Sequence, residues 1–219
     1  MAGELASAAS LPGPLEAAIK DVETRRAAAS ELRFAFKVRT VTSENEFRFL
    51  YDPEATEAWT LLSPETKETA KLRERMAKRE EQREESADRD LLAGDLRKLF
   101  GNRIEMVENT ATQRVYRFDL SEEAKIGDSA RFDAAKYLTG EMAVGPGDRL
   151  LWVRFFAQES FKPALVAKIE TFDLKLFYDT VWTDGPYVMV RQAMNVDGSA
   201  FFRSFAETVN TDYSGFEKR

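Results

Sequence analysis

Carboxylates and lysines are the residues of this sequence that could do chemistry, because its 219 residues include neither histidine nor cysteine. Paired carboxylates can hydrolyse glycosides, carboxylates can hold magnesium for phosphoryl transfer, and a desolvated lysine can form a Schiff base. The two missing residue types exclude Ser–His–Asp and Cys–His catalysis, and they remove the usual ligands of zinc and other transition metals. Disulfide bonds within the chain are excluded with them.

The carboxylates and lysines that remain show no catalytic arrangement. Asp119 and Asp173 fall on the polar phase of predicted strands, so we expect both to be exposed to solvent. Lys37, Lys168 and Lys175 also alternate with apolar residues, and nothing around them demands the burial that Schiff-base chemistry needs. We therefore predict no catalytic residue, no metal ligand and no cofactor, and a protein that is not an enzyme.

The aromatic residues are the most distinctive feature of the composition. The chain has 16 phenylalanines, 6 tyrosines and 3 tryptophans, concentrated in segments that alternate with the period of a strand. One such residue is usually part of a core. A curled sheet with few covering helices would instead leave space for an acyl chain or another apolar ligand, stabilised by roughly 0.8 kcal/mol per buried methylene. The candidate ligand-binding residues are Phe34, Phe36, Phe47, Phe49, Trp59, Tyr116, Phe118, Trp152 and Phe156.

Strands must position most of these residues. A helical spacing from Leu15 to Leu32 precedes three strands that alternation predicts at 34–40, 47–51 and 59–62. Later strands are predicted at 104–107, 115–120, 150–156, 165–178, 187–194, 200–209 and 211–216, with a short helix at 134–138. The strand at 165–178 is expected to bend near Thr171, and residues 195–199 (Asn-Val-Asp-Gly-Ser) predict a hairpin turn. In the strand at 150–156 both phases are apolar, so taking Trp152 and Phe156 as inward is an assumption.

One segment differs sharply from the strands. Residues 65–90 hold nine acidic and eight basic residues, with favourable i,i+4 pairs at Glu74 and Lys78 and at Glu85 and Arg89. This composition predicts either a long solvated helix that barely touches a core or a partly disordered insertion. An apolar helical stripe is then predicted from residue 91 to 100, ended by residues 101–102 (Gly-Asn).

The predicted fold class is α+β. Short turns between successive strands give an antiparallel sheet, and a single sheet of this length should curl while the helices cover one face. We expect residues 14–219 to form one domain with a charged helical insertion at about 65–90. Residues 1–13, rich in alanine, serine and glycine, are expected to be disordered.

Charge and hydropathy limit the partners. The net charge of −6 and the pI near 5.1 give no bulk attraction to nucleic acid or to an anionic membrane, although a local basic patch remains open. No stretch approaches the 18 apolar residues of a membrane span. Met1 to Pro14 lacks the basic and hydrophobic regions of an intact signal peptide, so it reads either as the start of a processed chain or as a native cytosolic start.

The order of elements and several short motifs resemble one known group. The motifs are the helix at 15–32, Phe34 to Val38, the Trp-containing segment at 58–62, residues 184–188 (Asp-Gly-Pro-Tyr-Val) and residues 211–216 (Thr-Asp-Tyr-Ser-Gly-Phe). Together they resemble the outer-membrane lipoprotein-sorting carriers and their relatives, the LolA/LppX-like superfamily. The resemblance implies an incomplete β-barrel covered by helices, a periplasmic location, and binding of lipid or lipoprotein acyl chains without catalysis. The charged segment is longer than in the sorting carrier itself, and Arg39 and Arg48 are the candidates for its strand arginine.

Three functions follow as hypotheses. The leading one is a periplasmic carrier or sensor that binds a lipid or acyl chain in an apolar cavity, with a membrane-associated protein as a further partner. The second is a structural or interaction protein with a filled core, which contacts its partner through the charged helix and fits a cytoplasmic location equally well. The third is an enzyme that uses carboxylates, and it requires two buried carboxylates facing each other across a cleft.

Overall fold

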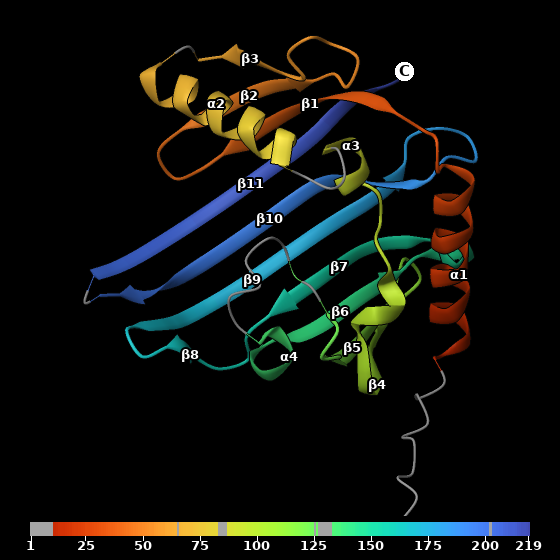
Figure 1. The fold of residues 1–219 in the computed structure, drawn as a ribbon. Coiled ribbons are helices and arrows are strands. Elements are labelled where there is room, and N and C mark those ends of the chain that lie inside the picture. Colours follow the sequence, from red (N-terminus) through yellow and green to blue (C-terminus); the bar gives the residue numbers. More distant parts are fainter. Residues whose placement is uncertain (1–10, 65, 83–86, 125, 127–132, 202) are drawn as a thin grey trace, which may run out of the picture.

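The chain folds around one antiparallel sheet of eleven strands. The computed structural model describes residues 11–64, 66–82, 87–124, 126, 133–201 and 203–219. The strand order is β3-β2-β1-β11-β10-β9-β7-β6-β5-β4, with β8 paired to β9 outside this path (Figure 1). The order ends in β3 and β4, so the sheet is open. The strands are β1 (Phe34–Val41), β2 (Glu46–Tyr51), β3 (Trp59–Ser63), β4 (Phe100–Asn109), β5 (Arg114–Leu120), β6 (Thr139–Val144), β7 (Leu150–Phe156), β8 (Phe161–Ala164), β9 (Ala167–Thr180), β10 (Tyr187–Ala200) and β11 (Arg203–Lys218).

Few helices accompany this sheet. They are α1 (Gly13–Ala28), α2 (Lys67–Gln82), α3 (Ala87–Asp90) and α4 (Ala134–Tyr137), with short 3₁₀ turns η1 (Leu96–Leu99) and η2 (Pro146–Asp148). Helices α1, α2 and α3 pack on one face, which we call the helix-covered face (Figure 1). The opposite face is called the open face. A mostly antiparallel, unclosed sheet with modest helical cover agrees with the predicted α+β class.

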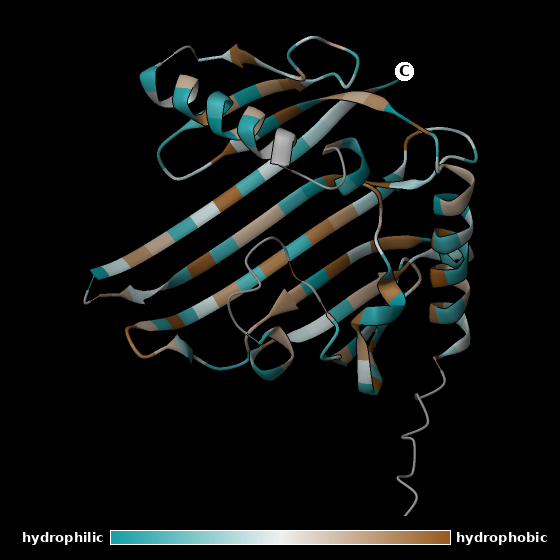
Figure 2. Ribbon diagram, viewed as in Figure 1, coloured by the Kyte–Doolittle hydropathy of each residue, from teal (hydrophilic) through white to brown (hydrophobic). Residues whose placement is uncertain are grey.

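Alternation along the central strands sorts their side chains onto the two faces. In β9, Leu174 and Leu176 pack on the helix-covered face, whereas Asp173 turns to the open face and pairs with Arg154. Figure 2 shows the result as alternating hydrophobic and hydrophilic bands along β9, β10 and β11. This period-two pattern is what a strand with one buried and one wet face requires.

The last strand joins the two halves of the sheet. β11 pairs with β10 from Asp212 to Arg203, and its other edge pairs with β1 through residues 210–218. The N-terminal meander of β1, β2 and β3 is therefore attached to the rest of the sheet by the C-terminal end of the chain. This long-range pairing is the part of the topology that no local pattern indicates.

One predicted turn lies elsewhere in the sequence. Residues 195–199 are not a hairpin turn but lie within β10, which continues to Ala200. Gly198 serves close backbone approach there, because a Cβ at this position would lie 2.3 Å from the carbonyl oxygen of Lys168. The actual turn includes Phe201, whose φ of 47° is in the left-handed region. The first two residues of the strand predicted at 165–178 form the turn between β8 and β9 instead, and its expected bend near Thr171 coincides with a register shift against β10.

The helical predictions hold in part. Helix α1 begins beside Pro14 and ends at Ala28, four residues before the predicted end. The apolar stripe at 91–100 forms only the single turn η1, and residues 101–102 do not end a helix but lie inside β4. The expected disorder of residues 1–13 concerns mainly residues 1–10, which are outside the described residues.

The described residues of the charged segment form helices α2 and α3, which both contact the core. Most described side chains of α2 are exposed, as expected, but Leu72 and Met76 pack against the core, and Thr69 is buried. Helix α3 contributes the fully buried Asp88. The segment therefore contacts the core more closely than its composition predicts.

Two apolar clusters hold the helices against the sheet. The first joins α1, η1 and strands β5, β6, β7 and β9, and its fully buried members include Leu15, Ile19 and Met142. The second joins β1, β2 and β3 to α3, and it includes Phe34, Phe36 and other aromatic residues. Among the helices of the described residues, none is both long and apolar enough to cross a membrane.

Candidate functional site

A hollow of about 550 Å³, with mostly apolar residues along its walls, lies on the helix-covered face between the central strands and helices α2 and α3. This volume falls in the range of roughly 300–1,000 Å³ that is common for ligand pockets. We call this hollow the trough. Its lining residues are Phe36, Val38, Thr40, Trp59, Met76, Ala87, Asp90, Leu91, Leu174, Leu176, Tyr178, Met189, Gln192, Thr211 and Tyr213.

A smaller hollow of about 160 Å³ lies beside the trough, toward η1. The two hollows share Leu174, Leu176 and Tyr178 of β9. The remaining walls of the smaller hollow are Gly94, Asp95, Leu96, Leu99, Ile126, Val153 and Phe155. Strand β9 thus lines both hollows, and its side chains form a continuous surface between them.

Buried ionic contacts fix one wall of the trough. Asp88 of α3 accepts a hydrogen bond from Nε of Arg33 at 2.9 Å and another from the backbone N–H of Phe34 at 3.1 Å. The neighbouring Arg89 donates to the carbonyl oxygen of Ala29 at 2.9 Å. These bonds hold α3 against the start of β1, so Ala87 and Asp90 keep their places beside the hollow.

A few polar side chains interrupt the apolar walls. The hydroxyls of Thr40 in β1 and Thr211 in β11 lie 3.2 Å apart, within hydrogen-bond distance, and Thr211 is buried. Gln192 of β10 and Tyr178 of β9 also face the trough, and neither side chain has a hydrogen-bond partner among the described residues. Apolar pockets with a small number of polar groups commonly use those groups to orient a ligand.

Tyr178 is the most unusual of these side chains. Burial raises the pKa of its phenol, because the surrounding protein disfavours the charged form. The side chain nevertheless keeps some accessible surface, and it lines both hollows. The hydroxyl is therefore withdrawn from bulk solvent while it remains open to anything that occupies the trough.

The aromatic residues predicted in the first three strands gather at one end of the trough. Phe36 and Trp59 line it, with ring centroids 6.0 Å apart. Phe34, Phe47 and Phe49 belong to the same cluster but pack behind the trough and do not line it. The sequence pattern thus located the aromatic wall without distinguishing lining residues from supporting ones.

The predicted residues of the second half lie elsewhere. Tyr116 and Phe118 of β5 are buried in the first apolar cluster and line neither hollow. Trp152 and Phe156 of β7 turn to the open face, contrary to the phase assumed from sequence. Val153 and Phe155, which belong to the other phase, line the smaller hollow instead.

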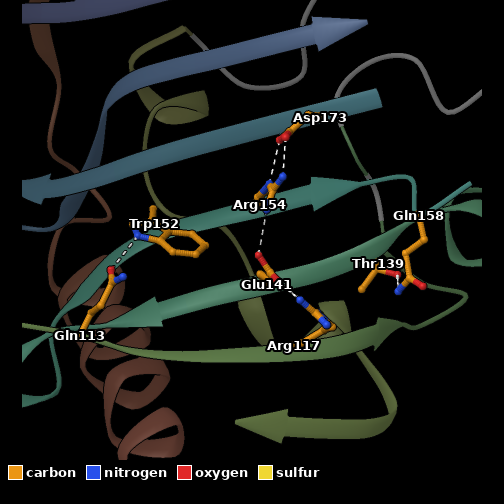
Figure 3. Close-up of polar contacts among 8 residues, drawn as sticks. All are labelled: Gln113, Arg117, Thr139, Glu141, Trp152, Arg154, Gln158 and Asp173. Atoms are coloured by element: carbon orange, nitrogen blue, oxygen red, sulfur yellow. Dashed lines mark hydrogen bonds and ion pairs between the residues drawn. The ribbon is translucent and has the colours of Figure 1, made fainter. Parts of the chain in front are cut away.

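Arg154 explains this phase of β7. On the open face its guanidinium pairs with Asp173 at 2.6 Å and with Glu141 at 3.2 Å, and Glu141 also pairs with Arg117 at 2.8 Å (Figure 3). Because Arg154 lies between Trp152 and Phe156 in the alternation, these two rings must share its face. The charge of Arg154 was the signal in the sequence that could have assigned Trp152 and Phe156 to the open face.

The buried carboxylates do not form a facing pair. Glu141 contacts two arginines on the open face, and Asp88 contacts Arg33 under α3. Asp173, expected to be exposed, is partly buried in its ion pair with Arg154. Among the described residues, no group of three or more carboxylates is placed to hold a metal ion.

A wider hollow of about 890 Å³ lies beside β4 and η1. Its walls carry charged side chains, including Asp95, Arg97, Lys98 and Glu123. Such walls give an apolar ligand little enclosure, so this hollow is a weaker candidate site than the trough.

Sequence reasoning missed most of the trough. Leu174, Leu176 and Tyr178 lie on one phase of a strand whose apolar residues were noted but not assigned to a face. Gln192 and Thr211 are polar, and a polar residue on the inner phase is recognisable only after the strands are paired. The long alternation in β9 was the one sequence signal that could have predicted that Leu174, Leu176 and Tyr178 share the face of the trough.

The comparisons with known proteins add no relative. No family model, no curated protein and no solved structure matches the chain. The fold and the site therefore define only a class, which is an α+β protein with an open antiparallel sheet and an apolar trough under its helices.

Proposed function

We propose that this protein is a non-catalytic carrier or sensor that binds an acyl chain or a similar apolar ligand in the trough. The observation that carries the proposal is the hollow of about 550 Å³ whose walls are mostly apolar side chains. Each methylene that moves from water into such walls is worth roughly 0.8 kcal/mol. A chain of several methylenes would therefore bind with useful affinity.

The polar groups of the trough narrow the ligand class. None of the described lining residues is a lysine or an arginine, and the charged one in the trough is Asp90. A carboxylate would enter this site without a cation to compensate its desolvation. The free groups of Tyr178 and Gln192 instead suit a neutral ester, amide or hydroxyl head, since these groups can both donate and accept hydrogen bonds.

The wider setting of the proposal is the LolA/LppX-like superfamily. Its incomplete β-barrel with a helical lid is compatible with the open sheet, the trough and the positions of α2 and α3. On this proposal the protein works in the periplasm and carries or senses lipid or lipoprotein acyl chains. A membrane-associated protein would deliver or receive the ligand.

Displacement of a fluorescent probe tests the proposal directly. The purified protein is titrated with N-phenyl-1-naphthylamine, and the bound probe is then competed with monopalmitoylglycerol or with palmitate. We expect saturable probe binding and tighter competition by the neutral glyceride than by the carboxylate. Failure of both lipids to displace bound probe would contradict acyl-chain binding, and tighter palmitate binding would contradict the neutral head.

Two adjacent residues of β9 provide matched variants. Leu176 lines both hollows, whereas Phe177 faces the open side and packs near Trp152. Leu176→Trp fills the trough and should abolish probe binding, while Phe177→Trp should leave it unchanged. Equal loss in the two variants, with both still folded by circular dichroism, would place the probe outside the trough.

The second candidate function is a protein-interaction module. It is favoured by α2, whose described side chains are mostly exposed and charged, including Lys71, Arg73 and Glu74. Substitution of these three residues by alanine should then abolish capture of a partner without changing probe binding. The opposite result, lost probe binding with capture retained, would favour the carrier.

A further inference from the structure

Exposed apolar side chains gather at one end of the molecule. Leu165, in the turn between β8 and β9, has a relative exposure of 103%, and Phe201, in the turn between β10 and β11, has one of 72%. Val166 and Phe205 beside them are also exposed. We call these four residues the hairpin tip. Single exposed apolar residues are ordinary on protein surfaces, but adjacent ones on two turns are not.

The two turns lie side by side. The backbone N–H of Phe201 donates to the carbonyl oxygen of Val166 at 2.9 Å, and Ala200 pairs with Ala167 at the last position of the β9–β10 ladder. In Figure 1 these ends of β9, β10 and β11 project together beyond the helices, and the turn between β8 and β9 is strongly hydrophobic in Figure 2. The apolar side chains therefore form one projection held by the sheet.

Basic side chains lie at the two turns of this projection. Residues 161–169 and 198–206 contain Lys162, Lys168 and Arg203, and because Lys168 pairs with Glu170 at 2.6 Å, Lys162 and Arg203 carry the positive charge there. A lysine or arginine close to an anionic lipid surface contributes on the order of 1 kcal/mol to binding. The hairpin tip thus concentrates both apolar area and positive charge.

We propose that the hairpin tip docks the protein onto a lipid bilayer that contains anionic lipid. The protruding leucine and phenylalanine side chains enter the interfacial layer, while Lys162 and Arg203 lie at the level of the headgroups. The tip is convex, so a protein partner would need a matching pocket to bury its apolar side chains. A lipid bilayer can deform around the same side chains without such a pocket. The proposal stands on the exposure and charge of the tip, and it does not depend on a ligand in the trough.

Vesicle flotation tests the proposal with the full chain. Wild type is mixed with vesicles of phosphatidylcholine and phosphatidylglycerol, or of phosphatidylcholine alone. We expect binding to the mixed vesicles, and about tenfold weaker binding by the double variant Leu165→Ser/Phe201→Ser, because binding scales with the apolar area inserted. The matched control is Leu62→Ser/Met106→Ser, which removes two exposed apolar side chains elsewhere and should bind like wild type.

A charge variant separates the two contributions. Lys162→Gln/Arg203→Gln should weaken binding to the mixed vesicles about thirtyfold while changing binding to pure phosphatidylcholine little. Equal loss in the control pair, or no wild-type binding to the mixed vesicles, would overturn the proposal. So would sedimentation showing that wild type self-associates through the tip and that the tip variants are monomers without any change in vesicle binding.

Discussion

Tyr178 places a hydroxyl in the middle of an apolar wall without a partner among the described residues. Most buried tyrosines contribute through a hydrogen bond, and Tyr187 is an example, since its hydroxyl donates to Asp21 at 3.0 Å. The hydroxyl of Tyr187 therefore stabilises the fold, whereas the hydroxyl of Tyr178 is free to bind a ligand.

Replacement of each tyrosine by phenylalanine tests this distinction. Tyr187→Phe should lower the free energy of unfolding by about 1 kcal/mol, because it removes the hydrogen bond to Asp21, which keeps its ion pair with Arg25. Tyr178→Phe should leave that free energy unchanged or raise it by up to about 1 kcal/mol, because it removes an unsatisfied polar group. Urea unfolding measures both values, and a comparable loss in Tyr178→Phe would show that its hydroxyl has a partner in the fold.

Individual residues also show what a sequence can and cannot reveal about the site. The alternation of Phe34 and Phe36 was sufficient to predict an aromatic wall, because a strand period is local. The inward role of Tyr178 and Gln192 depends on neighbours that are distant in sequence. Trp152 was assigned to the cavity because it is large and apolar, although Arg154 two residues later shares its face.

Helix α3 is the element on which the cover of the trough depends. It has only four residues, so contacts with other elements, rather than helix stability, hold it in place. Asp88 supplies two of these contacts from a fully buried position.

Asp88→Ala should therefore be strongly destabilising. The change leaves the buried N–H of Phe34 and the guanidinium of Arg33 without their acceptor, at a cost of about 2–4 kcal/mol. Asp95→Ala is the control, since Asp95 pairs with Lys98 at the surface and its loss should cost less than about 0.5 kcal/mol. Chemical unfolding compares the two, and equal effects would mean that Asp88 does not anchor α3.

Helix α1 is tied to η1 by a surface ion pair with a predictable pH dependence. Arg97 donates to Glu16 at 2.6 Å, and this hydrogen bond lowers the pKa of the Glu16 carboxyl. The contribution of the pair is thus complete above the unfolded pKa of about 4.3 and is lost as pH falls through the lower folded value. Because both groups are exposed, we expect only about 0.2–1 kcal/mol.

Glu16→Gln measures that contribution. Wild type should exceed the variant in free energy of unfolding at pH 7, and the difference should vanish at a pH below the folded pKa of Glu16. A difference that persists under acid conditions would mean that packing, rather than charge, is responsible.

Elements with local signals were predictable, and those defined by distant contacts were not. The bounds of β7 match the predicted 150–156, because a strongly apolar run between breakers is a local signal. The turn predicted at 195–199 failed because Asn, Asp and Gly also occur where a strand bulges or approaches another backbone closely, as Gly198 does.

At the scale of the whole molecule, β11 changes character along its length. Residues 210–212 pair with both β1 and β10, residues 213–218 pair with β1, and residues 203–209 pair with β10 alone and form an edge. The exposed end of this strand is also the end that carries Phe205 of the hairpin tip.

Hydrogen exchange should reveal the two parts of β11. Amides of residues 210–212 should exchange at least about tenfold more slowly than outward amides of residues 203–209, because the outer part lacks one neighbouring strand. Nuclear magnetic resonance of the free protein provides the rates. Uniform protection along the whole strand would require an additional neighbour for the edge, such as a second copy of the chain.

The overall sheet order was not predictable from the sequence. Alternation and short turns indicated an antiparallel sheet, and they correctly gave a fold of strands with few helices. The neighbour of β1 lies at the other end of the chain, however, and nothing in residues 34–41 identifies it.

That pairing has a consequence for how the protein is made. A ribosome releases Phe34–Val41 long before it releases the segment that completes their ladder, so the growing chain carries an aromatic strand with one vacant edge for most of its synthesis. Such an edge invites pairing with a neighbouring nascent chain. The order of this sheet therefore leaves the early strands open to such pairing until residues 210–218 emerge, and a chaperone that shields their edge would reduce it.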